Sequence, residues 1–176
     1  MQFKKEKIYT LVTTAFLVAL KIVLERFLSY SVWNLRIGFS FIAVAFAAAF
    51  YGPVSAMIVA GLGDFWGAIL FPSGQYFPGF TLTAILTALC TALFIHKNVN
   101  FAKITLSVLI NQIFGSVLLN SLWISMLYSN NYIATLAARL YQAAFMTAVQ
   151  IIVTQLLFGK NSKVRAVVTK QLCKMR

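Results

Sequence analysis

The stretch Ile42-Ala-Val-Ala-Phe-Ala-Ala-Ala-Phe-Tyr-Gly-Pro53 decides the fold class of this chain. It carries no charge, and it lacks the alternation of polar and apolar residues that marks a strand of a membrane barrel. In lipid, only helices and closed barrels satisfy all of their backbone hydrogen-bonding groups. The stretch therefore predicts a membrane helix, which Gly52-Pro53 joins to the next helix with almost no loop.

The composition places the rest of the chain in the same environment. Of its 176 residues, 61% are hydrophobic and only 10% are charged, whereas a soluble domain is about half apolar and about a quarter charged. Most of the surface is therefore expected to face lipid. The net charge of +12 then indicates membrane topology before it indicates binding to nucleic acid.

Six apolar segments follow one another, and each approaches the length of a bilayer-spanning helix. They cover residues 8–28, 35–51, 53–71, 79–95, 104–128 and 133–158, of which the second is short. The chain is predicted to be an all-α integral membrane protein, with residues 1–158 as a single six-helix bundle. Residues 159–176 are predicted to be a basic cytoplasmic tail, attracted to anionic lipid rather than to nucleic acid.

Basic residues are distributed unequally between the two predicted sides of the membrane. With the N-terminus inside, the opposite loops at 29–36, 72–78 and 129–132 contain a single basic residue, Arg36. The cytoplasmic side contains Lys4, Lys5, Lys7, Lys97, Lys103, Lys160, Lys163, Arg165, Lys170, Lys174 and Arg176. This positive-inside bias predicts a multi-pass protein of the cell membrane with both termini in the cytoplasm.

Charged residues within the spans predict where a ligand would bind. Such residues are costly in lipid and usually face a bundle interior or a water-filled cavity. Arg26, Arg36 and Arg139 are expected near the outer ends of their segments. Asp64 lies about 16 Å along the helix from Pro53, close to the membrane midplane. None of these charges falls in the inner half, so the sequence predicts a cavity open only outward rather than a conduction path.

The remaining candidate ligand-binding residues are aromatic or amide side chains of the outer half. Aromatic faces beside fixed charges suit a flat, polar-edged, anionic ligand. The candidates are Trp66, Tyr76, Phe77, Phe80, Asn120 and Trp123.

Ion pairing within the protein is the alternative interpretation of each charge. Lys21 and Glu25 are one helical turn apart and are expected to pair with each other. Asp64 has two interpretations that stay open: it pairs with Arg26 or Arg139, or it contacts the ligand. Three arginines against one carboxylate leave positive charge over, and this surplus favours an anionic ligand.

The sequence offers nothing for catalysis, metal binding or nucleotide binding. It contains a single His and two isolated cysteines, Cys90 and Cys173, and it has no GxxxxGK[ST] motif. Because a metal site or a nucleophile–base pair needs clustered groups, no enzyme activity, metal or cofactor is expected.

Small and polar residues in the spans predict contacts between helices. Asn111 and Gln112 are expected to bridge helices rather than to bind ligand. Ala15 and Ala19 form an Ala-xxx-Ala face that lets another helix approach closely. Arg26 falls within about 20° of that face. If the Ala15/Ala19 face meets a partner helix, Arg26 must reach the cavity by snorkelling or through a bend in the helix.

Four stretches carry a family resemblance. They are Leu35-Arg-Ile-Gly-Phe-Ser-Phe-Ile-Ala43, Tyr51-Gly-Pro53, Gly63-Asp64 and Pro72-Ser-Gly-Gln-Tyr-Phe-Pro-Gly-Phe-Thr-Leu-Thr83. They resemble the folate-family substrate-binding (S) components of energy-coupling factor (ECF) transporters. The similarity covers roughly residues 8–158 and is most specific across 35–83. The chain departs from the family pattern at Ala43, where Pro is usual, and at Ala47 or Ala48, where Gly is common.

The resemblance implies a vitamin-capturing subunit that works with a transmembrane coupling subunit and two cytoplasmic ATPases. It implies that Ala15 and Ala19 meet the coupling subunit, and that the S component topples in the membrane to carry its ligand inward. It also implies that the loop at 29–36 closes over the site.

Folate fits the residues read above. Its pterin would stack on Trp66 or on the aromatics of 76–80 and pair with Asp64, while its glutamate carboxylates would meet Arg26, Arg36 or Arg139. Two alternatives remain: an S component for another flat vitamin such as riboflavin, and a membrane assembly subunit without a ligand of its own.

Overall fold

The computed structural model describes residues 2–32, 35–72, 75–96, 100–129 and 131–158. Side chains at 2–7, 30–32 and 35–37 lie outside the described part, and so does the predicted basic tail at 159–176.

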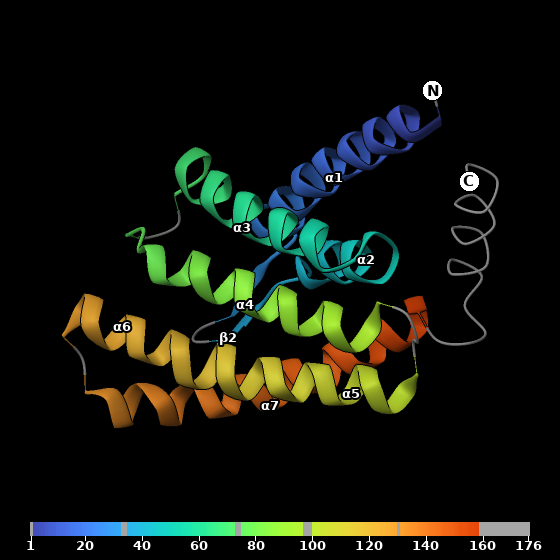
Figure 1. Ribbon diagram of the computed structural model, residues 1–176. Helices are drawn as coiled ribbons and strands as arrows, with labels where there is room; N and C mark the ends of the chain where they lie inside the picture. Colours follow the sequence, from blue (N-terminus) through green and yellow to red (C-terminus); the bar gives the residue numbers. More distant parts are fainter. Residues whose placement is uncertain (1, 33–34, 73–74, 97–99, 130, 159–176) are drawn as a thin grey trace.

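The described chain is helical apart from one short hairpin (Figure 1). Its elements in chain order are α1 (Gln2–Arg26), β1 (Tyr30–Val32), β2 (Leu35–Ile37), α2 (Phe41–Tyr51), α3 (Pro53–Leu70), α4 (Pro78–Ile95), α5 (Phe101–Ile110), the π-helix η1 (Asn111–Leu119), α6 (Asn120–Tyr128) and α7 (Tyr132–Phe158).

Local sequence explains where several helices begin. Pro53 and Pro78 stand at the first positions of α3 and α4, where the missing N–H costs nothing and the fixed φ favours the helix. At the start of α7, the Asn131 side chain accepts a hydrogen bond from the backbone N–H of Ile133 at 3.0 Å. Such caps satisfy donors that a helix leaves open.

Five helical stretches are long and apolar enough to cross a membrane: Ile8–Arg26, Pro53–Leu70, Pro78–Ile95, Phe101–Tyr128 and Tyr132–Phe158. They correspond to five of the six predicted spans. The predicted span at 35–51 is wrong at its start, because residues 35–37 form β2 and the helix begins at Phe41. The 11 residues of α2 extend about 16 Å at about 1.5 Å per residue, about half of a hydrocarbon core.

The predicted all-α class is confirmed for the bundle, and the connection between α1 and α2 adds a short hairpin that was not predicted. There, β1 pairs antiparallel with β2, and Tyr30 lies opposite Ile37 while Val32 lies opposite Leu35. Tyr30, Val32 and Ile37 are aromatic or β-branched residues, which favour an extended, paired backbone over a loop. The sequence indicated only a loop at 29–36.

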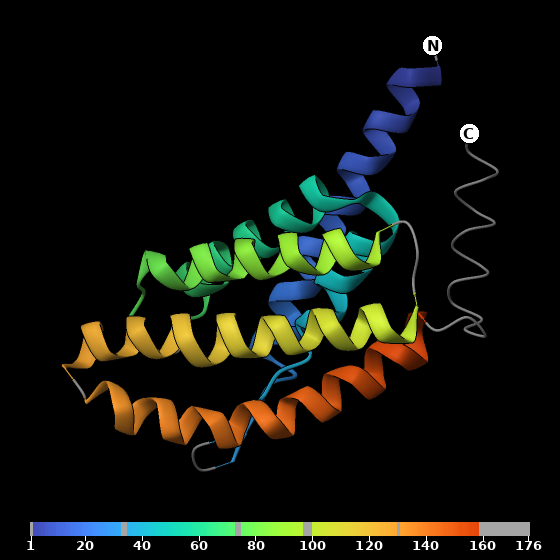
Figure 2. The ribbon, with the colours of Figure 1, turned by 60° about the horizontal axis from the view of Figure 1, so that its bottom comes forward.

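Helix α4 holds the two sides of the bundle together. It contacts α2 and α3 on one side and α5, η1 and α6 on the other. The continuous rod of α5, η1 and α6 lies between α4 and α7 in both views (Figures 1 and 2). The main buried cluster is rich in alanine and consists of Leu17, Ala47, Ala48, Ala56, Val59, Ala60, Ala88 and Ala92. Small side chains let membrane helices approach closely.

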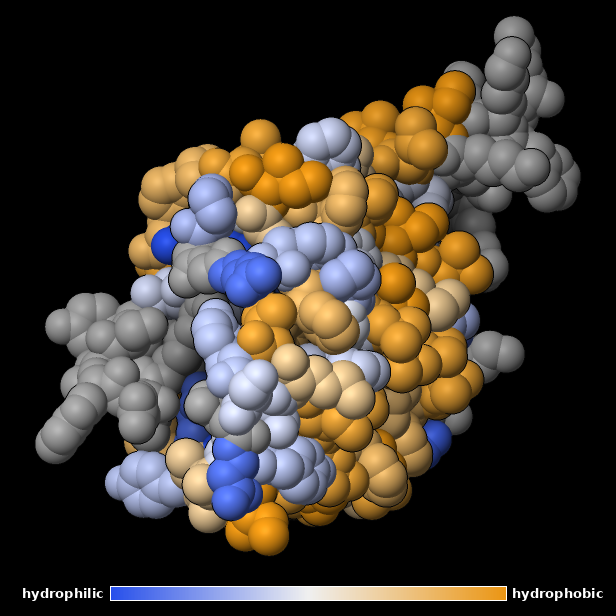
Figure 3. All heavy atoms as spheres, turned by 90° about the vertical axis from the view of Figure 1, so that its left-hand side faces the viewer, coloured by the Kyte–Doolittle hydropathy of each residue, from blue (hydrophilic) through white to orange (hydrophobic). Residues whose placement is uncertain are grey.

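The surface along the helices is apolar, as expected for helices that face lipid. Large apolar side chains are exposed on several of them, for example Leu11 (72%), Leu93 (71%) and Leu156 (73%). Polar side chains gather instead at the end where α3 leads to α4 and α6 leads to α7 (Figure 3). The start of α1 and the end of α7 both lie on the opposite side of the molecule, well separated from each other (Figure 1).

The turn between α2 and α3 depends on Gly52. Its φ of 88° and ψ of −172° lie in a region open almost only to glycine. A Cβ here would also lie 3.1 Å from Cε1 of His96, whose ring is held by a contact of 3.2 Å between Nδ1 and the Ala48 carbonyl oxygen.

We therefore expect Gly52→Ala to destabilise the protein by about 1–3 kcal/mol through backbone strain, with the His96 contact adding to it. Thermal unfolding in detergent, followed by circular dichroism, measures this. Gly38→Ala is the control, since its nearest neighbour would be Ser29 Cβ at 4.0 Å. Equal midpoints for the two variants would contradict the proposed strain.

Candidate functional site

A cavity of about 730 Å³ lies inside the bundle. Every helix contributes to its wall, and so do Ser29 and Gly38, which flank the β1–β2 hairpin. Its volume is within the range of about 300–1,000 Å³ found for small-molecule sites.

Charged side chains form one part of the cavity wall. Lys21, Glu25 and Arg26 come from α1, Asp64 from α3 and Arg139 from α7. Three cations face two carboxylates, so the described lining carries one net positive charge. Within a membrane such groups mark a binding site or pair with one another.

Lys21 and Glu25 pair as predicted, because Lys21 Nζ donates to Glu25 Oε2 at 2.7 Å. Lys21 is only 4% exposed. Its alkyl chain lies on Gly63 of α3, where a Cβ would come within 2.5 Å of Lys21 Cδ. Gly63 therefore makes room for a buried lysine. No ligand role was predicted for this pair, yet both residues line the cavity.

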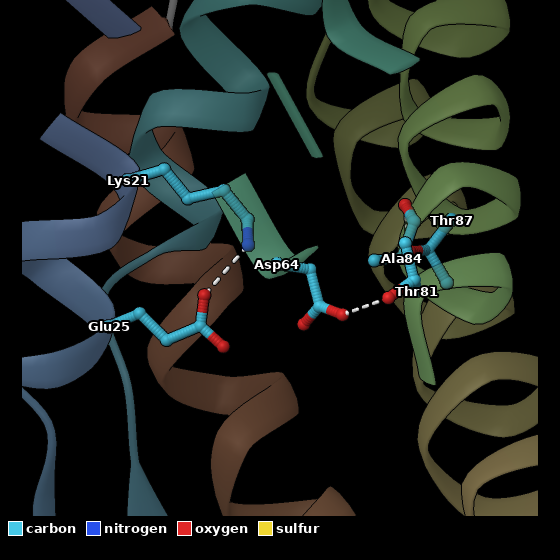
Figure 4. Close-up of polar contacts among 6 residues, drawn as sticks. All are labelled: Lys21, Glu25, Asp64, Thr81, Ala84 and Thr87. Carbon is cyan, nitrogen blue, oxygen red and sulfur yellow. Dashed lines mark hydrogen bonds and ion pairs between the residues drawn. The ribbon is translucent and has the colours of Figure 1, made fainter. Parts of the chain in front are cut away.

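Asp64 lies across from that pair (Figure 4). Its Oδ2 accepts a hydrogen bond from Thr81 Oγ1 at 2.6 Å. The Tyr76 hydroxyl lies 3.1 Å from the same Thr81 oxygen. The carboxylate is thus oriented by α4, and Tyr76 is fixed beside it.

Arg26 reaches the cavity over a glycine. A Cβ on Gly67 would lie 3.5 Å from Arg26 Nε, an ordinary van der Waals distance, so the Arg26 side chain packs beside Gly67 on α3. Ala15 and Ala19, on nearly the same angular face of α1, are exposed. The predicted conflict between the Ala-xxx-Ala face and Arg26 is resolved, because that face is open while the end of α1 lies on α3.

A second part of the cavity wall is polar but uncharged, and it lies between α4, α5, η1 and α7. Asn111 Nδ2 donates to Thr91 Oγ1 at 2.7 Å, so Asn111 bridges helices as predicted and also lines the cavity. The lining here includes Thr87, Thr91, Ser107, Asn111, Gln112, Gln150 and Thr154. The cavity therefore extends further along the bundle than the predicted outer-half pocket.

This uncharged part was not predicted, because the site was predicted from the charged residues of the spans. A signal was present, since Thr83, Thr87 and Thr91 recur every four residues on α4 and therefore share one helix face.

Six of the ten predicted ligand-binding residues line the cavity: Arg26, Asp64, Tyr76, Phe80, Asn120 and Arg139. Arg36 belongs to β2, but its side chain lies outside the described part. Trp66 is 46% exposed and does not line the cavity. Two residues along a helix turn the side chain by about 200°, so Trp66 and Asp64 cannot share a face.

Phe77 and Trp123 lie behind the cavity wall rather than in it. Their rings are 5.5 Å apart, and Trp123 Nε1 donates to Thr83 Oγ1 at 3.0 Å. Gly79 gives both rings their space, because a Cβ there would come within 2.6 Å of each. They support lining residues and are not placed to contact a ligand.

Residues 9–159 match the family described as "ECF transporter, substrate-specific component". The chain belongs to this family. It is a family of transporter components, not of enzymes. Among the described residues, no group of three His, Cys, Asp or Glu side chains could hold a metal ion.

Individual relatives of this S component carry a more specific name. It is 40% identical over 104 residues to "Folate transporter FolT" of Clostridium novyi, a match covering 58% of this chain and 60% of the relative. It is 34% identical over 99 residues to "Folate transporter FolT" of Leuconostoc mesenteroides, covering 55% and 53%. The matches thus span less than two thirds of these curated relatives.

A solved structure extends the similarity over most of the fold. The structure titled "Crystal structure of FolT bound with folic acid" matches with a TM-score of 0.77 and 30% sequence identity. The match covers 85% of this chain and 91% of that one.

The buried ion pair makes a prediction about stability. Glu25→Gln leaves the Lys21 ammonium buried without its anion, so we expect a loss of roughly 1–3 kcal/mol. The double variant Lys21→Met/Glu25→Gln removes both charges and keeps an unbranched chain over Gly63, so it should recover most of the loss. Unfolding in detergent measures both, and equal losses in the two variants would contradict the cost assigned to the unpaired Lys21 ammonium.

Proposed function

We propose that this chain is a folate-binding S component of an ECF-type vitamin importer. The observation that carries the proposal is the lining of the cavity, which combines surplus positive charge with uncharged hydrogen-bonding groups. Its family and its similarity to a FolT structure with folic acid support the same ligand.

Folate has two chemically different ends, and the two parts of the cavity complement them. Its glutamate tail carries two carboxylates, which the planar guanidinium groups of Arg26 and Arg139 bind as paired hydrogen bonds. Its uncharged pterin presents donors and acceptors along its edges. Thr91, Asn111 and Gln112 offer partners for those edges in a low-dielectric site, where each hydrogen bond is strengthened.

This arrangement replaces the pterin position that the sequence suggested. Trp66 does not line the cavity, and Asp64 is engaged by Thr81. Tyr76 and Phe80 line it beside Asp64. We assign them to the flat middle of the ligand, where aromatic faces contribute dispersion and stacking.

Arg36 is proposed as a third arginine of the site. The β1–β2 hairpin contacts α7, and Ser29 and Gly38 at its two ends line the cavity. A hairpin placed in this way can close over a bound ligand, in keeping with the closure expected for the loop at 29–36.

The remaining expectations concern membrane placement and partners. We propose a single membrane domain over residues 1–158 and a basic tail at 159–176, with both termini in the cytoplasm. A transmembrane coupling subunit and two ATPases would dock from the membrane and the cytoplasm, and the exposed Ala15/Ala19 face supports docking on the coupling subunit. Delivery would then proceed by toppling of the S component.

Ligand fragments test the proposal and the assignment of its two ends. Purified protein should bind folic acid saturably at micromolar concentration or below, followed by tryptophan fluorescence. Arg139→Gln should weaken folic acid about tenfold or more, because a charge-assisted hydrogen bond contributes about 1.5–3 kcal/mol. It should weaken 6-methylpterin far less, because that ligand has no glutamate carboxylates for Arg139 to bind, whereas Asn111→Leu should weaken both ligands.

Lys103→Gln on the exposed face of α5 and Trp66→Phe are the controls, and both should bind folic acid normally. An absence of saturable folic acid binding would exclude the proposed function. Binding of riboflavin in its place would identify the other-vitamin alternative, and complex formation without any vitamin would identify the assembly subunit.

The proposed docking face has a matched control on another helix. Ala15→Leu/Ala19→Leu should abolish folate uptake and co-purification with the coupling subunit, because leucine side chains hold two helices apart. Folic acid binding by the isolated protein should not change. Ala144→Leu/Ala148→Leu alters an equally exposed alanine pair of α7 and should leave uptake intact. Equal effects of the two double variants would contradict a docking face on α1.

A further inference from the structure

The rod that runs from Phe101 to Tyr128 changes its winding in the middle. Between α5 and α6, the nine residues of η1 (Asn111–Leu119) form a π-helix. π-helices are rare, are mostly single turns, and occur frequently at functional sites. A nine-residue segment beside a ligand cavity therefore calls for a physical reason.

The winding decides which side chains of α6 face the cavity. In an uninterrupted α-helix, Asn120 would lie about 180° around the rod from Asn111, since each residue turns the helix by about 100°. A π-helix has roughly 4.4 residues per turn and turns by about 82° per residue. Over the length of η1 the difference brings Asn120 to within about 40° of Asn111.

The lining of the cavity agrees with this geometry. Ten residues of the rod line it: Ser107, Val108, Asn111, Gln112, Gly115, Ser116, Asn120, Ile124, Leu127 and Tyr128. With η1 wound as a π-helix, all of them fall within one arc of about 160°. With α winding throughout, Ile124 would lie about 220° from Asn111, on the lipid side.

The exposed residues show the same shift from the opposite face. Leu109, Ile113, Leu118 and Met126 are large, apolar and exposed. The step from Ile113 to Leu118 is five residues, which exceeds a full turn by only about 50° in a π-helix but by about 140° in an α-helix. With α winding throughout, Leu118 and Met126 would turn toward the cavity, and Asn120 would turn toward lipid.

Contacts from both neighbouring helices hold η1 in place. On the α4 side, Asn111 donates to Thr91, and Gly115 packs so closely that a Cβ would lie 2.5 Å from Thr87 Cγ2. On the α7 side, Arg139 Nη1 donates to the backbone carbonyl oxygen of Ser116 at 3.4 Å. Each contact involves a cavity-lining residue, so the winding and the site are coupled.

We propose that η1 is the positioning segment of the ligand site, which turns α6 so that Asn120 joins Asn111 and Gln112 on one wall, and that Gly115 is the residue that permits it. The inference rests on the proposed function only for the identity of the ligand.

Cysteine labelling shows which side chains of η1 and α6 face the cavity, and it needs no ligand. In a Cys90→Ala/Cys173→Ser background, Asn120→Cys and Ile124→Cys are compared with Leu118→Cys and Met126→Cys in liposomes. A small, water-soluble thiol reagent should label the first pair at least tenfold faster, because those positions face the cavity. The reverse order would show an uninterrupted α-helix and overturn the proposal.

Adding folic acid to the same samples separates the two hypotheses. Slower labelling of Asn120→Cys in folic acid supports the positioning role and the ligand together. The expected labelling order without protection at any position would leave the register established and exclude folate as the ligand. Protection combined with the reverse order would exclude the positioning role alone.

A second experiment tests the close packing of Gly115 against Cγ2 of Thr87. Gly115→Ala should weaken folic acid binding about tenfold or more, because its Cβ pushes η1 away from α4. Thr87→Ser removes only Cγ2 and keeps the hydroxyl that bonds the carbonyl oxygens of Thr83 and Ala84. Gly115→Ala/Thr87→Ser should therefore bind nearly as well as Thr87→Ser alone, a rescue that general destabilisation would not produce.

Gly61→Ala is the matched control for this cycle. Gly61 is also a buried glycine packed on α4, but its Cβ would meet only the flexible end of Ile85 at 3.0 Å, and it does not line the cavity. It should bind folic acid normally. Unchanged binding by Gly115→Ala, or no recovery in the double variant, would contradict the role of Gly115.

Discussion

The packing of a charged face of α1 onto the glycines of α3 is the contact on which the site depends. A lysine in a membrane bundle is tolerated only with a partner and a place for its chain. Gly63 provides the place and Glu25 the partner, at 2.7 Å from Lys21 Nζ. One turn further, Arg26 lies beside Gly67 on the same face. A larger side chain at Gly63 would meet the Lys21 chain and separate α1 from α3, so a residue without a side chain decides where this charge of the cavity lies.

Helix α4 supplies the uncharged part by a different route. Thr83, Thr87 and Thr91 each donate to a carbonyl oxygen one turn earlier, namely that of Gly79, Thr83 and Thr87. Their donors are thus satisfied within the helix, as lipid requires, while their oxygens remain acceptors for Asn111 and Trp123. The cavity is polar along α4 without an uncompensated charge. Together with the charged face of α1, this separates the wall into regions of different chemistry, which suits a ligand with different ends.

The sequence predicted what depends on composition and local pattern, and it failed where neighbouring helices decide. Five spans followed from apolar length, and Arg26, Asp64 and Arg139 followed from the cost of charge in lipid. Trp66 was misplaced because nearness to Asp64 along the chain was taken for nearness in space. The β1–β2 hairpin was missed because three-residue strands leave hardly any pattern. The π-helix was beyond reach, since η1 is held by Thr87, Thr91 and Arg139 from other helices, and the sequence does not show that Asn111, Gly115 and Ser116 meet them.

Charge balance connects the proposed ligand to the hairpin. Lys21, Arg26 and Arg139 face Glu25 and Asp64 in the described lining, a surplus of one positive charge. The glutamate tail of folate brings two negative charges into a site where unpaired charge is costly. One further cation is needed for balance. Arg36, in the strand that contacts α7, is the basic residue that the chain carries in the connection between α1 and α2. Its proposed role thus follows from electrostatics, and the same charge balance would favour closure of the hairpin when the ligand is bound rather than when the site is empty.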